Sequence, residues 1–192
     1  GKYYKYNYEI NNIYYCENNV IIDNFEVKEY PHEQYIVLDY FILDLKNKRI
    51  QTYWNDMELE DSFPNTIGTI KDIKIENDKD NKNILIKTDN SDEVDVIITL
   101  DKNNRIIALK NDKVENIGND FLHGNTSLTS IELPNATSIG ESFLYSNEIL
   151  TEIELPSATS IGDEFLFWNE SLTHIELPSA ICIGNYFLFY NN

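Results

Sequence analysis

The chain has 192 residues, 42% of them hydrophobic, which is enough to bury a core as one large domain or two small ones. Thirty-three acidic against fifteen basic side chains give a formal net charge of −18, which argues against direct binding of nucleic acid or of anionic membranes. No stretch is apolar over the length of a membrane span, so we expect no membrane insertion. The charge instead favours a protein partner with a basic surface.

Residues 1–105 are predicted to form a β-rich domain of antiparallel hairpins. Short runs of β-branched and aromatic residues are separated by polar turns at 46–49, 77–82 and 101–105, a pattern typical of strands joined by hairpins. The predicted strands cover residues 20–30, 35–45, 50–54, 70–76, 83–88 and 94–100. We expect no helix longer than two turns, and no family is recognised in this region.

Residues 106–192 repeat with a period of 22 residues. An Ile-Gly pair recurs at 117, 139, 161 and 183, and the surrounding unit recurs with it. The copies read "IIALKNDKVENIGNDFLHGNTS" (106–127), "LTSIELPNATSIGESFLYSNEI" (128–149), "LTEIELPSATSIGDEFLFWNES" (150–171) and "LTHIELPSAICIGNYFLFYNN" (172–192). A repeat of this length predicts a solenoid of four coils, the last incomplete, whose first apolar layer is covered by the domain at 1–105.

Each position of the unit has a physical interpretation. Ile131 and Leu133 alternate with glutamates, as in a strand with one buried face, and Pro134 ends that strand. The glycine after each Ile permits a bend, and the following Phe-Leu pair supplies the bulk of the core. An asparagine then recurs at 125, 147, 169 and 191. Because a primary amide has donors and an acceptor, we expect a ladder that satisfies buried backbone groups.

The unit "LTxIELPxATSIGxxFLxxN" resembles the leucine-rich repeat of the bacterial BspA-like, or Treponema-type, class. It departs from the usual unit of that family in having Asn where Cys is common and Leu after the Phe. The resemblance implies a solenoid without an active site, and relatives are typically surface proteins concerned with adhesion or host contact. It implies no particular ligand, because repeat scaffolds share a fold and differ in their exposed positions.

The first candidate binding site consists of outward positions on the repeat strands. Ser130, Glu152 and His174 form one column, and Glu132, Glu154 and Glu176 form the next, with about 4.8 Å between neighbours if the strands stack in parallel. Two interpretations stay open: a solvated acidic face, or a docking strip for the Lys and Arg side chains of a partner. Glu152 beside His174 offers a metal only two ligands, so we expect neither a metal nor another cofactor.

A second candidate follows each Phe-Leu pair, where the side chains grow in size toward the C-terminus, from His123 and Gly124 to Phe189 and Tyr190. One member of each pair either packs inside the coil or joins an exposed surface, and Trp168 and Tyr190 are the better candidates for an interface. The last coil also predicts an apolar edge. Further polypeptide, a partner or self-association with a second copy is expected to cover it.

These features predict a non-catalytic protein-interaction module rather than an enzyme. The sequence has no nucleophile elbow, phosphate-binding glycine loop, zinc-protease motif or spaced Cys/His set. The family resemblance favours a bacterial adhesion or surface protein. The alternative is a small intracellular inhibitor, of the kind a phage encodes, that blocks the basic nucleic-acid channel of an enzyme such as a CRISPR effector by acidic mimicry.

The two cysteines, Cys16 and Cys182, lie far apart in the sequence and form no metal-binding motif, so we expect two free thiols. The N-terminal residues include lysines and tyrosines where a signal peptide needs an apolar run. The chain as given therefore predicts a cytoplasmic protein, whereas removal of an export signal ahead of Gly1 would place it at the cell surface or outside the cell.

Overall fold

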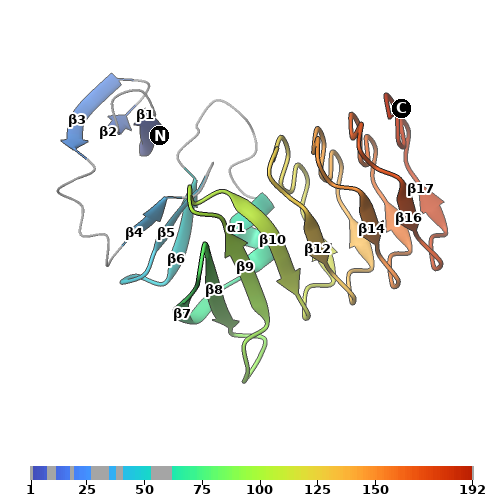
Figure 1. Cartoon of the computed structure of the whole chain (residues 1–192), viewed down its shortest axis with the longest axis horizontal. Coiled ribbons are helices and arrows are strands. Elements are labelled where there is room, and N and C mark those ends of the chain that lie inside the picture. The colour runs from blue at the N-terminus through green and yellow to red at the C-terminus, as the bar shows by residue number, and fades with distance from the viewer. Residues whose placement is uncertain are drawn as a thin grey trace.

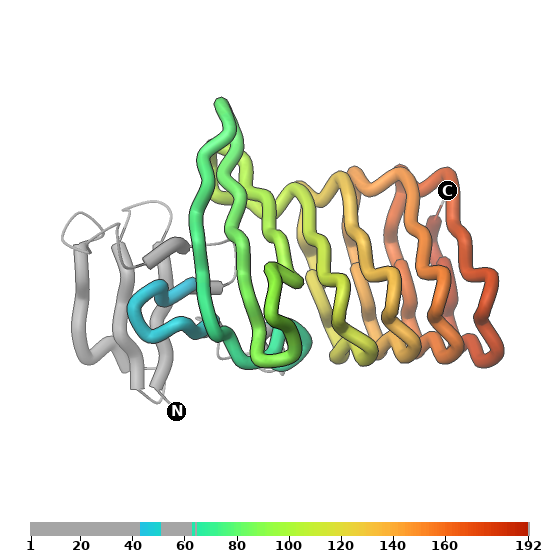
Figure 2. Tube along the Cα trace, turned by 90° about the horizontal axis from the view of Figure 1, so that it is seen from below, coloured from blue at the N-terminus to red at the C-terminus, as the bar shows by residue number. Residues whose placement is uncertain are grey.

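The computed structural model describes residues 2–7, 12–17, 20–26, 35–37, 41–52 and 62–191, with side chains for 43–50, 63 and 65–191. In these residues the protein is mainly β, as the sequence predicts, with one short helix. An antiparallel region leads into a solenoid whose coils stack one behind another toward the C-terminus (Figures 1 and 2). No helix in the described part of the chain has the length and apolarity needed to cross a membrane.

Two small antiparallel sheets form the N-terminal side. The first has the order β1-β2-β3, with β1 at Lys2–Asn7, β2 at Asn12–Glu17 and β3 at Val20–Glu26. The second has the order β4-β5-β6, with β4 at Tyr35–Val37, β5 at Phe41–Asp44 and β6 at Arg49–Thr52. The hairpin predicted around residues 46–49 is confirmed, whereas β1 and β2 were not predicted. The predicted strand at 35–45 corresponds to two described strands, and its residues 38–40, like the predicted strand residues 27–30 and 53–54, lie outside the described part.

A five-stranded sheet joins the hairpins to the solenoid. After α1 (Ser62–Ile67), the strands are β7 (Ile70–Asp78), β8 (Asn81–Thr88), β9 (Val96–Leu100), β10 (Ile106–Asn111) and β12 (Ser130–Glu132). Their order is β12-β10-β9-β8-β7. Strand β10 pairs antiparallel with β9 and parallel with β12, so it is both the last hairpin strand and the first solenoid strand. The division into domains at residue 105 remains a prediction.

The repeat forms a regular coil. Strands β11 (Asn116–Ile117), β13 (Ser138–Ile139), β15 (Ser160–Ile161) and β17 (Cys182–Ile183) make a continuous parallel sheet along one side of the solenoid. The Ile of each Ile-Gly pair lies in register with the Ile 22 residues later, which confirms that the four pairs form one file. On another side, β14 (Glu152–Glu154) pairs in parallel with β16 (His174–Glu176).

The interior of the solenoid is filled by a column of stacked phenylalanines. Neighbouring ring centroids are 5.3 Å apart for Phe63–Phe121, 6.2 Å for Phe121–Phe143, 5.6 Å for Phe143–Phe165 and 5.4 Å for Phe165–Phe187. Phe63 belongs to α1, so the helix supplies the first ring of a column that the repeat continues. The Thr66 hydroxyl of the same helix accepts a hydrogen bond of 3.0 Å from the Gly118 amide of the first coil. These contacts favour the proposal that the N-terminal region covers the first coil.

The predicted asparagine ladder is present. The side-chain amides of Asn147, Asn169 and Asn191 donate to the carbonyls of Leu122, Leu144 and Leu166 in the preceding coil, at 3.0, 2.9 and 3.0 Å. The expected use of the acceptor oxygen is wrong for two members, because Asn147 Oδ1 and Asn169 Oδ1 are buried without a hydrogen-bond partner among the described residues. The ladder therefore holds neighbouring coils together mainly through its donors.

The glycines of the Ile-Gly pairs have a different role from the predicted one. Positive φ among the glycines occurs at Gly68 and Gly124, not at Gly140 or Gly162. A Cβ added at Gly140 or Gly162 would lie 2.6 Å from backbone atoms of the preceding coil. These glycines are therefore needed because two backbones approach closely, and not because the chain bends in a left-handed conformation.

The left-handed residues lie instead in the turn that follows. Eleven non-glycine residues of the coils have φ between 52 and 57°, namely Asp120, Leu122, Ser142, Leu144, Ser146, Glu164, Leu166, Trp168, Tyr186, Leu188 and Tyr190. This conformation is costly for a bulky L-residue. Hydrogen bonds between coils stabilise it, such as those from the Leu166 amide to the Phe143 carbonyl (3.1 Å) and from the Ser146 amide to the Phe167 carbonyl (2.8 Å).

Candidate functional site

Five of the seven predicted binding residues lie on one surface of the solenoid. We call Glu132, Glu152, Glu154, His174 and Glu176 the acidic face. All five are exposed and project from β12, β14 and β16, where a strand alternates between buried and outward positions. Ile131 and Ile153 are buried in the core and Ile175 is half-buried, so carboxylates are the main outward groups of the three strands.

The two ends of the acidic face contain positive or titratable partners. Lys110 on β10 lies in register with Glu132, and its ammonium is 3.3 Å from the Glu132 carboxylate and 3.5 Å from that of Asp112. The hydrogen bond to Glu132, together with the charges of Asp112 and Glu132, raises the pKa of Lys110. At the other end, His174 Nε2 is 3.1 Å from Glu176 Oε1. This protein therefore already pairs a lysine with its acidic face.

The middle of the acidic face has no such partner. Within residues 43–50, 63 and 65–191, no ion pair involves Glu152 or Glu154. Residues two apart on one strand lie about 7 Å apart, and two exposed carboxylates at that separation repel by roughly 0.6 kcal/mol in water. A cation brought by another molecule would remove that repulsion, so the centre of the acidic face is the part most suited to a basic partner.

One group of side chains has the composition of a metal site. A carboxylate oxygen of Glu154, an imidazole nitrogen of His174 and a carboxylate oxygen of Glu176 lie within 4.8 Å of one another. The sequence pointed to Glu152 beside His174, whereas the structure groups His174 with Glu154 and Glu176. All three side chains are exposed, and the His174–Glu176 hydrogen bond already accounts for their arrangement. We therefore assign no metal here.

The spacing expected along the acidic face depended on the strands stacking in parallel, and at one step the strands do not pair. Glu152 lies opposite His174 and Glu154 opposite Glu176, as expected. Strands β12 and β14 belong to different sheets, however, and among the described residues no backbone hydrogen bond joins them. The ladder is therefore interrupted between the second and third coils.

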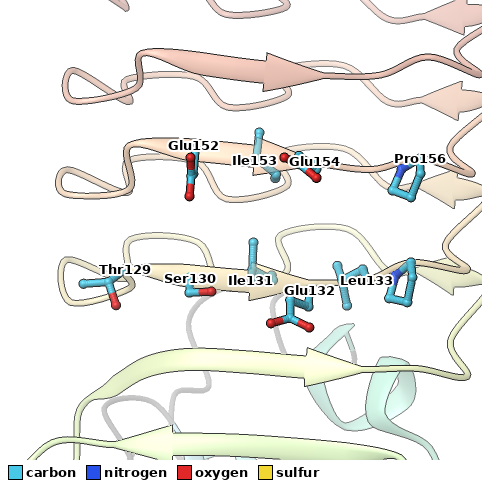
Figure 3. A pocket seen from close by; sticks show the side chains of 10 residues that line it. Thr129, Ser130, Ile131, Glu132, Leu133, Glu152, Ile153, Glu154 and Pro156 are labelled. Carbon is cyan, nitrogen blue, oxygen red and sulfur yellow. The ribbon is translucent and has the colours of Figure 1, made fainter.

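A hollow of about 360 Å³ lies at this interruption. It is lined by Thr129–Pro134 on one side, and by Glu152, Ile153, Glu154 and Pro156 on the other (Figure 3). In Figure 3 the Glu152 side chain extends from β14 toward β12, whereas Glu132 extends away from β14. The carboxylate of Glu152 therefore faces the gap between the two strand edges, whereas that of Glu132 is directed to the other side of β12, where it pairs with Lys110.

Trp168 and Tyr190, the other two predicted residues, belong to a separate aromatic cluster. A half-exposed column of rings runs along the turns, with centroids 4.5 Å apart for His123–Tyr145, 4.9 Å for Tyr145–Phe167 and 5.6 Å for Phe167–Phe189. Trp168 and Tyr190 pack beside this column, with 5.8 Å between their own centroids. They remain 46% and 61% exposed. The column shields its inner members, and burial together with the charge of Glu164 raises the pKa of Tyr145.

The outward side of the last coil is unusually apolar. Ile181 is 81% exposed, although Thr137 and Thr159 occupy the same position in the preceding coils and are also exposed there. Cys182 beside it is an exposed free thiol. No charged side chain occurs in residues 177–192.

A second hollow, of about 580 Å³, was not foreseen from the sequence. It lies where α1 and the turn between β8 and β9 meet β10 and β11. Its buried carboxylate, Asp95, accepts hydrogen bonds of 2.8 Å from the Thr88 amide and 2.5 Å from the Thr88 hydroxyl. Because both carboxylate oxygens are occupied within the fold, we regard Asp95 as a residue that holds the turn and not as a binding group.

Comparison with protein families identifies the repeat. Residues 101–192 match the family described as "BspA type Leucine rich repeat region (6 copies)". No curated protein and no solved structure matches the chain.

Proposed function

Because residues 101–192 are a BspA-type leucine-rich repeat region, we propose that the protein is a non-catalytic module that binds another protein through its acidic face. The family is a protein-interaction and surface module and is typically non-catalytic. The observation that supports the acidic face as the contact is the pair Glu152 and Glu154, two outward carboxylates without an ion-pair partner among the described residues. The partner we propose has a basic surface, in keeping with eleven acidic residues and no Lys or Arg after Lys113.

The aromatic cluster is proposed as the apolar part of the same interaction. Trp168 and Tyr190 are large, exposed and held by neighbouring rings, and such residues contribute strongly to interfaces at a small entropic cost. Charged groups on the acidic face would then set the rate of association and the choice of partner, while the aromatic rings would contribute buried area.

We expect reversal of Glu132, Glu154 and Glu176 to Lys to abolish binding of basic ligands. The probe is a random dodecapeptide library displayed on phage, selected on the wild-type protein. Enriched peptides should be rich in Lys and Arg, and their affinity should fall steeply as salt rises, because exposed charges are screened over about 8–10 Å. The triple variant should lose at least about a hundredfold in affinity for those peptides, since each reversed contact replaces attraction by repulsion.

The matched control reverses Glu141, Glu148 and Glu170 to Lys. These residues are also exposed and change the net charge equally, but they lie outside β12, β14 and β16. Their variant should keep most of the affinity. Selection of peptides without basic residues, or equal losses in the two triple variants, would refute the acidic face as the binding site.

For the biological setting, the family favours a bacterial adhesion or surface role, in which the partner is a matrix or envelope protein. The alternative we retain is an intracellular inhibitor that occupies a basic nucleic-acid channel, which the net charge of −18 favours. Competition separates the two roles. If the protein is an inhibitor, duplex DNA should compete with it for the captured partner. If the partner is an adhesion protein, added DNA should leave binding unchanged.

We further propose that the outward side of the last coil supports self-association. Ile181 projects outward where Thr137 and Thr159 do, and no charge lies nearby in residues 177–192 to repel a second chain. Ile181→Thr, which restores the residue of the preceding coils, should shift the protein toward monomer in sedimentation equilibrium. Ser157→Ala on the preceding coil serves as the control. If wild-type protein and Ile181→Thr show the same mass at high concentration, self-association through this side is excluded.

A further inference from the structure

The interruption of the ladder between β12 and β14 leaves specific backbone groups unused. In the neighbouring coils, the Thr129 amide donates to the Ile107 carbonyl (2.8 Å) and the Thr173 amide donates to the Thr151 carbonyl (2.8 Å). The hydroxyls of the same two threonines also bond to those carbonyls. The equivalent bonds from Thr151 to the Thr129 carbonyl are absent among the described residues.

A third bond is missing at the same place. The Leu155 amide donates to the Glu176 carbonyl (3.0 Å), but no bond from the Leu133 amide to the Glu154 carbonyl occurs in the described part of the chain. Among the described residues, the gap therefore has two backbone acceptors without a partner, the Thr129 and Glu154 carbonyls, and two such donors, the Thr151 and Leu133 amides.

On the other sides of the solenoid, backbone hydrogen bonds join the second and third coils. The Thr159 amide donates to the Thr137 carbonyl (2.9 Å) and the Leu166 amide to the Phe143 carbonyl (3.1 Å), so the second and third coils remain joined elsewhere. The opening is confined to the acidic face. At this step Glu152 and Glu154 line the hollow without an ion pair among the described residues, whereas Glu132 pairs with Lys110 on the other side of β12.

We propose that this gap receives an arginine side chain of the protein partner. The inference rests on the proposed function and deepens it by naming the group that the centre of the acidic face recognises. A guanidinium has five N–H donors in one plane, which suits a narrow gap between two strand edges bordered by backbone carbonyls and carboxylates. The Lys110–Glu132 ion pair is an example of a cationic side chain that binds a carboxylate of the acidic face. An ammonium has fewer donors and a stronger hydration shell, so arginine is the better match.

The first experiment titrates ¹⁵N-labelled protein with Nα-acetyl-arginine methylamide, with its lysine analogue Nα-acetyl-lysine methylamide and, as a neutral isostere, with Nα-acetyl-citrulline methylamide. The arginine compound should shift the amide resonances of Thr151 and Leu133 and bind at least about tenfold more tightly than the citrulline compound. Glu152→Gln and Glu154→Gln should weaken binding by a similar factor, whereas the exposed control Glu170→Gln should not. Equal shifts from arginine and citrulline, equal affinity for the lysine analogue, or no shift at all would overturn the proposal.

The second experiment uses a substitution that is expected to close the gap between β12 and β14. Glu154→Lys places a lysine on β14 opposite Glu132, just as Lys110 on β10 lies opposite Glu132 from the other side of β12. We expect this lysine to allow β12 and β14 to pair. Hydrogen exchange of the Thr151 and Leu133 amides should slow by at least about tenfold in this variant, and the arginine compound should no longer bind. Unchanged exchange together with retained binding would overturn the assignment of the gap. If the gap fails both tests while the peptide library still selects basic ligands for the acidic face, the proposed function survives and only the arginine site is lost.

Discussion

We expect Phe165→Ala to lower the free energy of unfolding by about 4 kcal/mol, the largest effect of any single substitution considered, because the change removes a fully buried ring and leaves a cavity. Phe165 stacks on Phe143 and Phe187, so its loss also interrupts the column on both sides. Chemical denaturation followed by circular dichroism measures this quantity. Broadening of the transition would indicate that the coils on either side of the gap unfold separately, as neighbouring repeats can.

The matched control is Phe189→Ala, two residues after the next phenylalanine of the column. Phe189 is 46% exposed and packs only in the outer aromatic cluster. Its removal should cost about 1 kcal/mol. Equal losses for the two substitutions would contradict the assignment of Phe165 to the core and Phe189 to the surface.

Gly162→Ala is expected to destabilise the protein by about 3 kcal/mol, because the new methyl group overpacks a contact between backbones. The Cβ would lie 2.6 Å from Gly140 and Glu141 backbone atoms, which cannot move aside as a flexible side chain can. Thermal unfolding monitored by calorimetry gives the change.

Ser160→Ala, two residues earlier on β15 and exposed, provides the comparison and should leave the unfolding free energy within about 0.5 kcal/mol. A Gly162→Ala protein as stable as Ser160→Ala would mean that the coils are further apart than the structure has them. It would also restore the bend-permitting role that the sequence alone favoured for this glycine.

The solenoid was predictable because a repeat turns sequence columns into spatial columns. Once the Ile-Gly pairs were aligned, the positions of the phenylalanines, the asparagine donors and the outward glutamates followed from the period and from strand alternation. The acidic face could therefore be named residue by residue. The period also singled out Trp168 and Tyr190, after the Phe-Leu pairs, as candidates for an interface, but it could not show that they pack against a column of rings.

The remaining features depend on contacts between coils, which the 22-residue period of the sequence does not specify. Gly140 and Gly162 look like turn glycines in the sequence, and only the distance between coils shows that they allow close approach. The gap between β12 and β14 could not be read from the sequence, because nearly the same residues occur in the coils that do pair, and Glu154 lies opposite Glu176 in a ladder that forms. Strands β1 and β2 were missed because their tyrosine- and asparagine-rich segments show little alternation of apolar and polar residues.

Zero-length cross-linking is the most direct test that the acidic face is the binding surface. Carbodiimide joins carboxylates only to amines in contact with them, so a lysine-containing peptide selected on the wild-type protein can be cross-linked and the joined residues located by mass spectrometry. We predict that the cross-links concentrate on Glu132, Glu152, Glu154 and Glu176. Cross-links spread over the other acidic residues of the chain, or concentrated on Glu141, Glu148 or Glu170, would contradict the account.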